Sequence, residues 1–164
     1  MRSKWILAAL VVLVGGALYA GTVLASSQAT TTSLADKIAF GEIDINDHAV
    51  PADTWQARLK TQGDSDGYIV DNVVPAHSTT GWHTHPGPSL IFVIRGAVTN
   101  VTGDATSCNE TTYAAGTGFV DEGGGDVHML RNDGDVDAET IAVQLLPKGA
   151  VRKTPEPAPA GCAQ

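Results

Sequence analysis

The sequence predicts an all-β fold, a sandwich or barrel, preceded by one short helix. From residue 67 onward, short runs rich in β-branched and aromatic residues alternate with clusters of glycine, aspartate and asparagine. Regularly spaced runs of this kind are typical of strands joined by turns. The chain shows no internal repeat and no glycine-rich phosphate loop, so neither a repeat architecture nor a phosphate-loop fold is indicated.

The first 25 residues have the layout of a secretory signal. Arg2 and Lys4 precede a dense apolar run that ends in small residues, and Ala25 offers a cleavage site. The apolar run is also close to the ~20 residues that span a bilayer, so an uncleaved N-terminal anchor is the alternative. Glycines within the run favour the cleaved signal. The protein is then expected to be secreted or periplasmic.

The segments that precede the barrel are predicted one by one. Residues 26–36 are polar and indicate a linker. Residues 38–45 (IAFGEIDI) indicate a first strand. Residues 52–60 (ADTWQARLK) form the one stretch with helix-like spacing, set by Trp55 and Leu59, and predict the short helix.

The predicted barrel domain covers residues 37–150 and holds the remaining strands. These strands are expected at residues 67–76, 89–101 with a break at Gly96, 111–122, 126–132 and 139–147. Residues 90–94 are apolar at every position, which predicts a strand that is covered on both faces. A homodimer that covers one of these faces would fit this pattern.

The charge of the chain excludes one class of partner. The formal net charge is −8, and both Arg2 and Lys4 lie in the first 25 residues, so removing that segment makes the charge more negative. An acidic surface repels nucleic acid and anionic membranes, so we expect neither as a partner, apart from a possible N-terminal anchor. A small-molecule ligand or substrate is the expected partner.

Cys108 and Cys162 are the two cysteines of the chain. They lie too far apart for a CxxC metal or redox motif, and an even pair in an exported protein favours a disulfide over two free thiols. The bridge would close a loop of about 55 residues, worth roughly 4 kcal/mol in the chain-entropy model. It would tie the proline-rich tail, residues 151–164, back onto the domain.

The stretch TGWHTHPGPS (residues 80–89) contains His83 and His85, one residue apart. On a strand, their side chains point to the same side with Cα atoms about 6.7 Å apart. His128 lies in a second apolar stretch and comes within reach if the two strands are neighbours. Three neutral imidazoles suit zinc, iron, copper or nickel and leave coordination positions open. The alternative is that these histidines are solvated or hydrogen-bonded polar residues.

Two motifs around these histidines resemble those of the cupin family. The first motif has an H-x-H pair, a glutamate three or four residues later and a closing glycine; the second has a histidine and, four residues on, an asparagine. The matching residues are His83, His85 and Gly96 in the first motif, and His128 and Asn132 in the second. The position of the glutamate holds Ser89. The resemblance covers about residues 68–146.

The resemblance implies a double-stranded β-helix, the jelly-roll barrel of cupins, with a metal in its mouth. It implies His83, His85 and His128 as ligands of one divalent transition metal, which could be Fe, Mn, Ni, Cu or Zn. Ser89 is a doubtful fourth ligand because a neutral hydroxyl binds such ions poorly. The site would then have three histidines, as in some metal-dependent dioxygenases of the family.

Two classes of function follow from this reading. The first is an exported, metal-dependent small-molecule enzyme of dioxygenase or oxidoreductase type. The second is a non-catalytic module that binds a small ligand or a metal on the same barrel, which the missing glutamate favours. A metal-free structural domain is a third alternative. Because one fold serves many chemistries, the choice rests on the site itself.

Three further residues are candidates for acid–base chemistry near the mouth. His77 lies six residues before His83 and is the candidate general base, with an exposed loop histidine as the alternative reading. Asp121 and Glu122 could act as acid or base, although solvated carboxylates in a turn are commoner.

Overall fold

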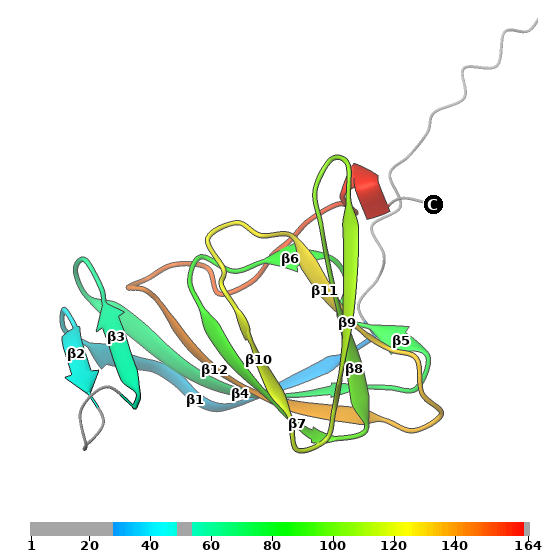
Figure 1. Cartoon of the computed structure of the whole chain (residues 1–164), viewed down its shortest axis with the longest axis horizontal. Helices are drawn as coiled ribbons and strands as arrows, with labels where there is room; N and C mark the ends of the chain where they lie inside the picture. The colour runs from blue at the N-terminus through cyan, green and yellow to red at the C-terminus, as the bar shows by residue number, and fades with distance from the viewer. Residues whose placement is uncertain (1–27, 49–53, 163–164) are drawn as a thin grey trace, which may run out of the picture.

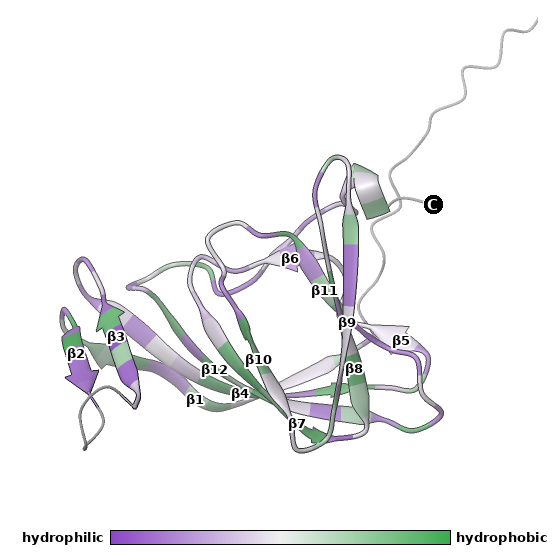
Figure 2. Cartoon of the chain, viewed as in Figure 1, coloured by the Kyte–Doolittle hydropathy of each residue, from purple (hydrophilic) through white to green (hydrophobic). Residues whose placement is uncertain are grey.

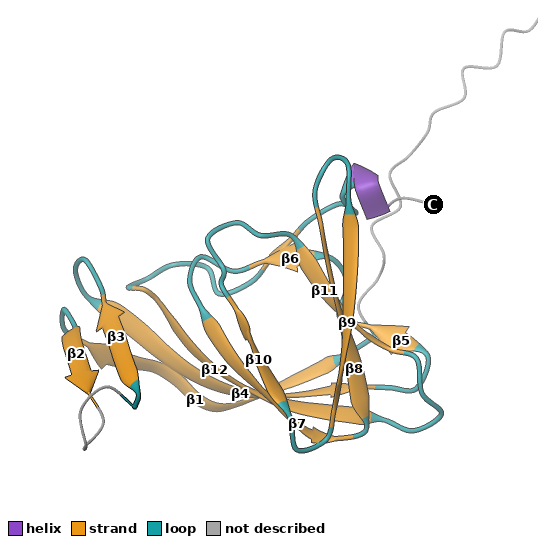
Figure 3. Cartoon of the chain, viewed as in Figure 1, coloured by secondary structure: helices purple, strands orange, loops and turns teal. Residues whose placement is uncertain are grey.

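The computed structural model describes residues 28–48 and 54–162, and the regular secondary structure within these ranges is almost entirely β-strand (Figures 1 and 3). The predicted signal or anchor at residues 1–25 lies outside the described residues, as do the first two residues of the predicted helix. No helix among the described residues is long and apolar enough to cross a bilayer.

The strands follow one another along the chain with short connections. Their bounds are β1 Thr30–Phe40, β2 Asp44–His48, β3 Gln56–Lys60, β4 Ser65–Val74, β5 Ser78–Thr79, β6 His83–Thr84, β7 Ser89–Arg95, β8 Ala97–Gly103, β9 Cys108–Ala114, β10 Gly118–Asp121, β11 His128–Asn132, β12 Ala138–Pro147 and β13 Thr154–Pro155. A single 3-10 turn, η1 Ala160–Cys162, follows β13.

Two antiparallel sheets enclose the interior of the molecule. One has five strands in the order β1-β4-β12-β7-β10, and the other has the order β13-β6-β11-β8-β9 with β5 beside β11. A separate hairpin, β2-β3, stands beside the first sheet (Figure 1). The non-consecutive strand order within two facing sheets is that of a double-stranded β-helix, which confirms the predicted fold class.

The core lies between the sheets, where alternate residues of each strand point inward. One apolar cluster consists of Val93, Val98, Leu130 and Ala138, and a second consists of Val70, Ile91 and Ala142. Phe119 packs against both clusters. The rest of the interior is polar and holds the histidines, so the apolar clusters form only one part of the barrel's filling.

The break at Gly96 is confirmed, and the structure supplies its reason. Gly96 has φ +67° and turns the chain from β7 into β8. A Cβ atom at this position would lie only 3.0 Å from the Cα of Ala138 and the carbonyl oxygen of Asp137. Both the left-handed backbone and the close packing therefore require glycine at the end of the first motif.

The predicted helix is wrong, because residues 56–60 form strand β3. Ile45 lies opposite Leu59 in the β2-β3 hairpin, and Lys60 Nζ donates to Asp44 Oδ2 at 2.7 Å across it. The helix-like spacing of two apolar residues did not reveal that a partner strand lies just upstream. Cross-strand pairing supplies the backbone hydrogen bonds here and overrides the local pattern.

The predicted linker also needs correction, because strand β1 begins at Thr30. It pairs with β4 over its whole length, from Thr30 opposite Val73 to Phe40 opposite Ser65. The segment is polar because it forms the sheet edge and is largely exposed. Its sequence therefore has the composition of a linker, although its backbone is part of the sheet.

The expectation that residues 90–94 are covered on both faces is wrong within this chain. Ile91 and Val93 are buried, whereas Leu90, Phe92 and Ile94 are 50%, 47% and 53% exposed. These apolar residues lie on the outer face of β7, a strand coloured as hydrophobic in Figure 2. An apolar groove of about 630 Å³ continues over this face beneath the hairpin. Homodimerisation through the outer face stays a prediction.

Arg131 forms ion pairs with Glu110 and Asp133 on the six-stranded sheet. Its guanidinium donates to both carboxylate oxygens of Glu110, at 2.9 and 2.8 Å, and to Asp133 at 2.6 Å. Since β8 lies between the strands of Arg131 and Glu110, the forked contact spans three strands. These hydrogen bonds lower the pKa of both carboxyl groups.

An Arg131→Gln variant is expected to be less stable than the wild type at neutral pH but not in acid. Lowered folded-state pKa values stabilise the fold above the ordinary values of 4.5 and 3.8, and this stabilisation is lost as the pH falls through the folded values. Urea midpoints should differ at pH 7 and converge below about pH 3. An undiminished difference in acid would contradict this assignment. Arg95→Gln, which breaks a longer contact of 3.4 Å to Glu139, is the control.

Candidate metal centre

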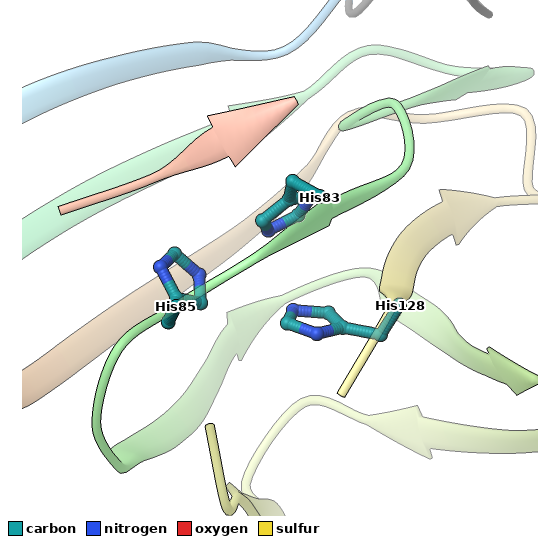
Figure 4. A group of neighbouring side chains, drawn as sticks. All are labelled: His83, His85 and His128. Carbon is teal, nitrogen blue, oxygen red and sulfur yellow. The ribbon is translucent and has the colours of Figure 1, made fainter. Parts of the chain in front are cut away.

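Three buried histidines meet inside the barrel. His83 begins β6, His85 follows directly after it, and His128 begins β11 opposite His83. Their ring centroids lie 4.4 to 5.4 Å apart, and one nitrogen from each ring lies within 4.8 Å of the other two. Figure 4 shows the three rings converging from the two neighbouring strands. The sequence analysis named the same three residues.

Each of the three rings is oriented by a backbone carbonyl. The Nδ1 atoms of His83 and His85 lie 2.7 Å from Gly81 O and 2.6 Å from Arg152 O, and that of His128 lies 3.3 Å from Asp126 O. Since a carbonyl oxygen only accepts, each Nδ1 carries the proton and donates it. The lone pair is then on Nε2 of every ring, which is the arrangement found in histidines that bind metals.

Burial favours the neutral form of His83 and His85. Desolvation, reinforced by the nearby charges of His128 and Lys153, lowers the pKa of His83 to about 2. Burial also lowers the pKa of His85, partly opposed by its hydrogen bond to Arg152. A metal ion binds neutral imidazole, so the environment favours the binding-competent form across the physiological range.

Ser89, which occupies the position of the missing glutamate, contacts a carboxylate. Its hydroxyl donates to Asp121 Oδ2 at 3.3 Å and accepts from Gln144 Nε2 at 2.9 Å. Asp121 lies opposite Ser89 on the adjacent strand β10. An acidic group therefore faces the histidines from the neighbouring strand, instead of from position 89 itself.

Asp121 is the functional candidate to which the sequence analysis gave too little weight. It is buried, with Oδ2 3.9 Å from His85 Nε2 and Oδ1 3.7 Å from His128 Nδ1. Its Oδ1 also accepts the backbone N–H of Gly123 at 3.1 Å. The usable signal was its place at the end of an apolar strand, two residues before the glycine run that leads to His128.

The glycine run itself is explained by backbone packing. Gly123 has φ +68°, and a Cβ atom there would collide with the backbone of Gly87. The turn between β10 and β11 is thereby pressed against the Pro86-Gly87-Pro88 loop, and the two segments that carry the histidines are held together. Turn geometry and close packing account for this run without a ligand.

The cavity at the histidines is small and has two kinds of wall. Its volume is about 40 Å³, enough for about three water molecules at roughly 10–15 Å³ for each probe position. The apolar wall consists of Val70, Ile91, Phe119, Leu130 and Ala142. The polar wall brings together the histidines, Asp121 and Gln144 with the side chains of Arg152 and Lys153. A metal ion with a few further atoms fills such a space.

A C-terminal strap, residues 151–162, closes one side of the site. Thr154 and Pro155 form β13 and pair with β6, opposite Thr84 and His83. The predicted disulfide is confirmed: Cys162 is bonded to Cys108 on β9, with Cα atoms 4.9 Å apart. The tail is fixed by β13 and by the bridge, and it supplies the carbonyl that orients His85.

Two other residues of the motifs and their surroundings have structural or surface positions. Asn132 is buried, and its Nδ2 donates to the carbonyls of Val74, Pro75 and Val136, so it fixes the turn after β11. His77 is 64% exposed and contacts Asp135 at 3.1 Å. The structure does not bring His77 to the histidine cluster, so it has no position from which to act as a base there.

Comparisons with known proteins give one family match and several similar solved structures. A family model described as a cupin domain matches residues 70–144. Peruvianin-I, a cysteine peptidase from Thevetia peruviana latex, is 18% identical, with a TM-score of 0.48 over 56% of each chain. An oxalate oxidase in complex with the substrate analogue glycolate is 19% identical, with a TM-score of 0.44 over 48% of this chain and 41% of its own.

A cupin superfamily protein from Desulfitobacterium hafniense is 10% identical, with a TM-score of 0.45 over 74% of this chain and 82% of its own. The chain spans about half the length of the first two structures. No curated protein matches the sequence significantly. The family match coincides with the part of the barrel that carries both motifs, and residues 70–144 are therefore similar to a cupin domain.

Proposed function

We propose that His83, His85 and His128 hold one divalent transition metal and that the protein is an exported, metal-dependent small-molecule enzyme of oxidoreductase type. The observation that carries the proposal is the set of three buried rings whose Nδ1–H groups are all satisfied by carbonyls. Without an ion, three Nε2 lone pairs would face one another in a buried space, which is costly unless a cation is shared among them.

Asp121 is proposed as the acidic partner of this ion. A divalent ion on three neutral imidazoles keeps its full charge, and a carboxylate 3.9 Å from one ligand nitrogen offsets part of it. Ser89 and the backbone of Gly123 orient the carboxylate by donating to one oxygen each. The chain thus replaces the family's glutamate with a carboxylate that the adjacent strand supplies.

The donor set fits iron, manganese, nickel, copper or zinc, since imidazole nitrogen with one carboxylate suits all of them. When bound, such an ion supplies Lewis acidity and, for a redox-active metal, electron transfer. The protein's own contribution is to orient a small substrate against the apolar wall and to exclude bulk water. Asp121 is the group placed to accept or return a proton beside the ion.

A non-catalytic module that binds a small ligand or metal is the second candidate. The observation that favours it is that His77 lies outside the site, which leaves Asp121 as the one carboxylate among the described cavity-lining residues and no separate base. Both candidates use the same ion and cavity. They differ in whether the bound molecule is changed.

Export of the protein is part of the proposal. The Cys108–Cys162 disulfide is typical of proteins that fold in an oxidising compartment. A secretory signal at residues 1–25 would deliver the chain there, and an uncleaved anchor would hold it at the membrane surface.

Elemental analysis of protein purified from an oxidising compartment tests the metal site. We expect about one equivalent of transition metal per chain, as a single three-histidine site requires. Incubation with small metabolites, followed by NMR and an oxygen electrode, separates the two candidates: an enzyme consumes oxygen or converts a compound, and a binding module returns it unchanged. Protein that takes up no metal after reconstitution would rule out the metal-dependent enzyme and leave a module that binds a small ligand without a metal.

A further inference from the structure

Two cations in the cavity wall form no ion pair with any residue that the structure describes. Arg152 and Lys153 both line the cavity and are at most partly exposed. Arg152 Nη1 donates to Gln144 Oε1 at 3.1 Å, and Lys153 Nζ donates to the Thr80 carbonyl at 3.0 Å. Neither forms an ion pair with a described residue, whereas several exposed arginines and lysines of the chain do.

Both side chains keep hydrogen-bonding capacity. A guanidinium has five N–H donors and an ammonium has three, and the described contacts of these groups use one donor of each. Arg152 Nη1 and Lys153 Nζ therefore hold fixed positions while their remaining donors stay available. Burial lowers the pKa of both groups, and for Arg152 the electrostatic effects of Tyr68 and Asp36 only partly oppose this lowering.

The balance of charge in the cavity is positive. Asp121 is the one acidic side chain among the described residues that line it, against two cations and the proposed divalent ion. The lining also includes apolar side chains such as Val70 and Leu130. Positively charged donors and apolar side chains in one cavity suit an organic anion better than a neutral molecule or an inorganic anion.

We propose that the cavity binds a small carboxylate, with its anionic end at Arg152 and Lys153 and its carbon atoms against the apolar wall. This rests on the proposed metal site for the remaining charge, but the two cations are present whether or not the ion is bound. The cavity volume limits the ligand to a few heavy atoms beside the ion. The class is therefore a short-chain carboxylic acid in its ionised form.

Titration of the zinc-loaded full chain with acetate and with acetamide tests this proposal by calorimetry. The two probes have the same shape and differ in charge, so they isolate the anionic group. We expect acetate to bind at least about tenfold more tightly, since hydrogen bonds to charged groups are stronger than neutral ones. Equal affinities, or tighter binding of sulfate than of acetate, would overturn the proposal.

The variant Arg152→Gln/Lys153→Gln is expected to lose the preference for acetate by about tenfold or more. The matched control, Arg95→Gln/Lys148→Gln, removes the same charge from the exposed surface and should keep it. Arg152→Lys keeps the positive charge and should therefore keep most of the preference for acetate. If the Arg152→Gln/Lys153→Gln variant kept the full preference for acetate and its thermal unfolding were unchanged, the proposal would also be overturned.

This experiment distinguishes failure of the proposed metal site from failure of the proposed carboxylate site. Zinc content is measured before each titration, and a chain that takes up no zinc contradicts the metal site. The same acetate and acetamide titrations on that metal-free chain then still decide whether Arg152 and Lys153 recognise an anion.

Discussion

A His83→Ala/His128→Ala variant is expected to bind divalent metal at least about 1000-fold more weakly than the wild type. Removing partners that only orient a metal ligand typically costs 10–100-fold, and this variant removes two proposed ligands directly. The remaining ring, that of His85, would face the ion almost alone. Competition against a chromophoric chelator measures the affinity, and elemental analysis measures the stoichiometry.

The matched control for this variant is His48→Ala/His77→Ala. It removes two imidazoles from exposed positions, one on β2 and one beside Asp135. Equal loss of metal in the control would show that binding is unspecific and would contradict the site. Retention of one equivalent by the His83→Ala/His128→Ala variant would contradict it as well.

Asp121→Asn, measured in the same titration, shows how much the carboxylate contributes to metal affinity. The amide keeps the shape of the side chain but removes its charge, so the affinity should fall by about 10–100-fold, between the wild type and the double histidine variant. Ser89→Ala leaves the charge in place and removes one hydrogen bond, so its effect should be smaller. An Asp121→Asn protein with wild-type affinity would show that the ion is held by the histidines alone.

A Cys108→Ser/Cys162→Ser variant is expected to lose about 4 kcal/mol of unfolding free energy. The disulfide joins residues 54 positions apart, and breaking it restores the conformational entropy of that loop in the unfolded chain. Urea unfolding measures the loss. The metal affinity should fall too, because the strap fixed by this bridge supplies the Arg152 carbonyl that orients His85.

Reductant provides the control for the disulfide. Dithiothreitol should lower the stability and metal affinity of the wild type to those of the Cys108→Ser/Cys162→Ser variant and leave the variant unchanged. An unfolding midpoint that is the same with and without the bridge would show that the strap is held by its strand pairing alone.

The strands of the barrel could be predicted because their signal is local. Alternating β-branched residues and glycine-rich turns mark β4, β7, β8, β11 and β12 directly in the sequence. The three histidines were found because H-x-H fixes two side chains on one side of a strand and the second motif supplies the third. The structure places these residues together as expected.

The parts that sequence reasoning missed depend on pairing between distant segments. Strand β1 is polar because it forms an edge, and β3 is a strand because β2 lies beside it. Asp121 faces the histidines because β10 pairs with β7 in a register that places it opposite Ser89. Arg152 and Lys153 lie in the proline-rich tail. The cysteine pair predicted that this tail is tied to the domain, but not that it pairs with β6 beside the histidines.

The strap also sets the order in which the protein can mature. The hydrogen-bond acceptor of His85 is the Arg152 carbonyl, 67 positions later in the chain. The ring can therefore be oriented only after the strap has been synthesised and has paired with β6. Until the Cys108–Cys162 disulfide forms, the strap is held over that side of the barrel only by its pairing with β6 and can detach. An ion that binds before the disulfide forms would therefore find an accessible site in which His85 is not yet firmly oriented. Formation of the disulfide would fix the strap and slow the release of the ion. If the proposed ion binds at this site, the rate of metal release should therefore depend on whether the disulfide has formed.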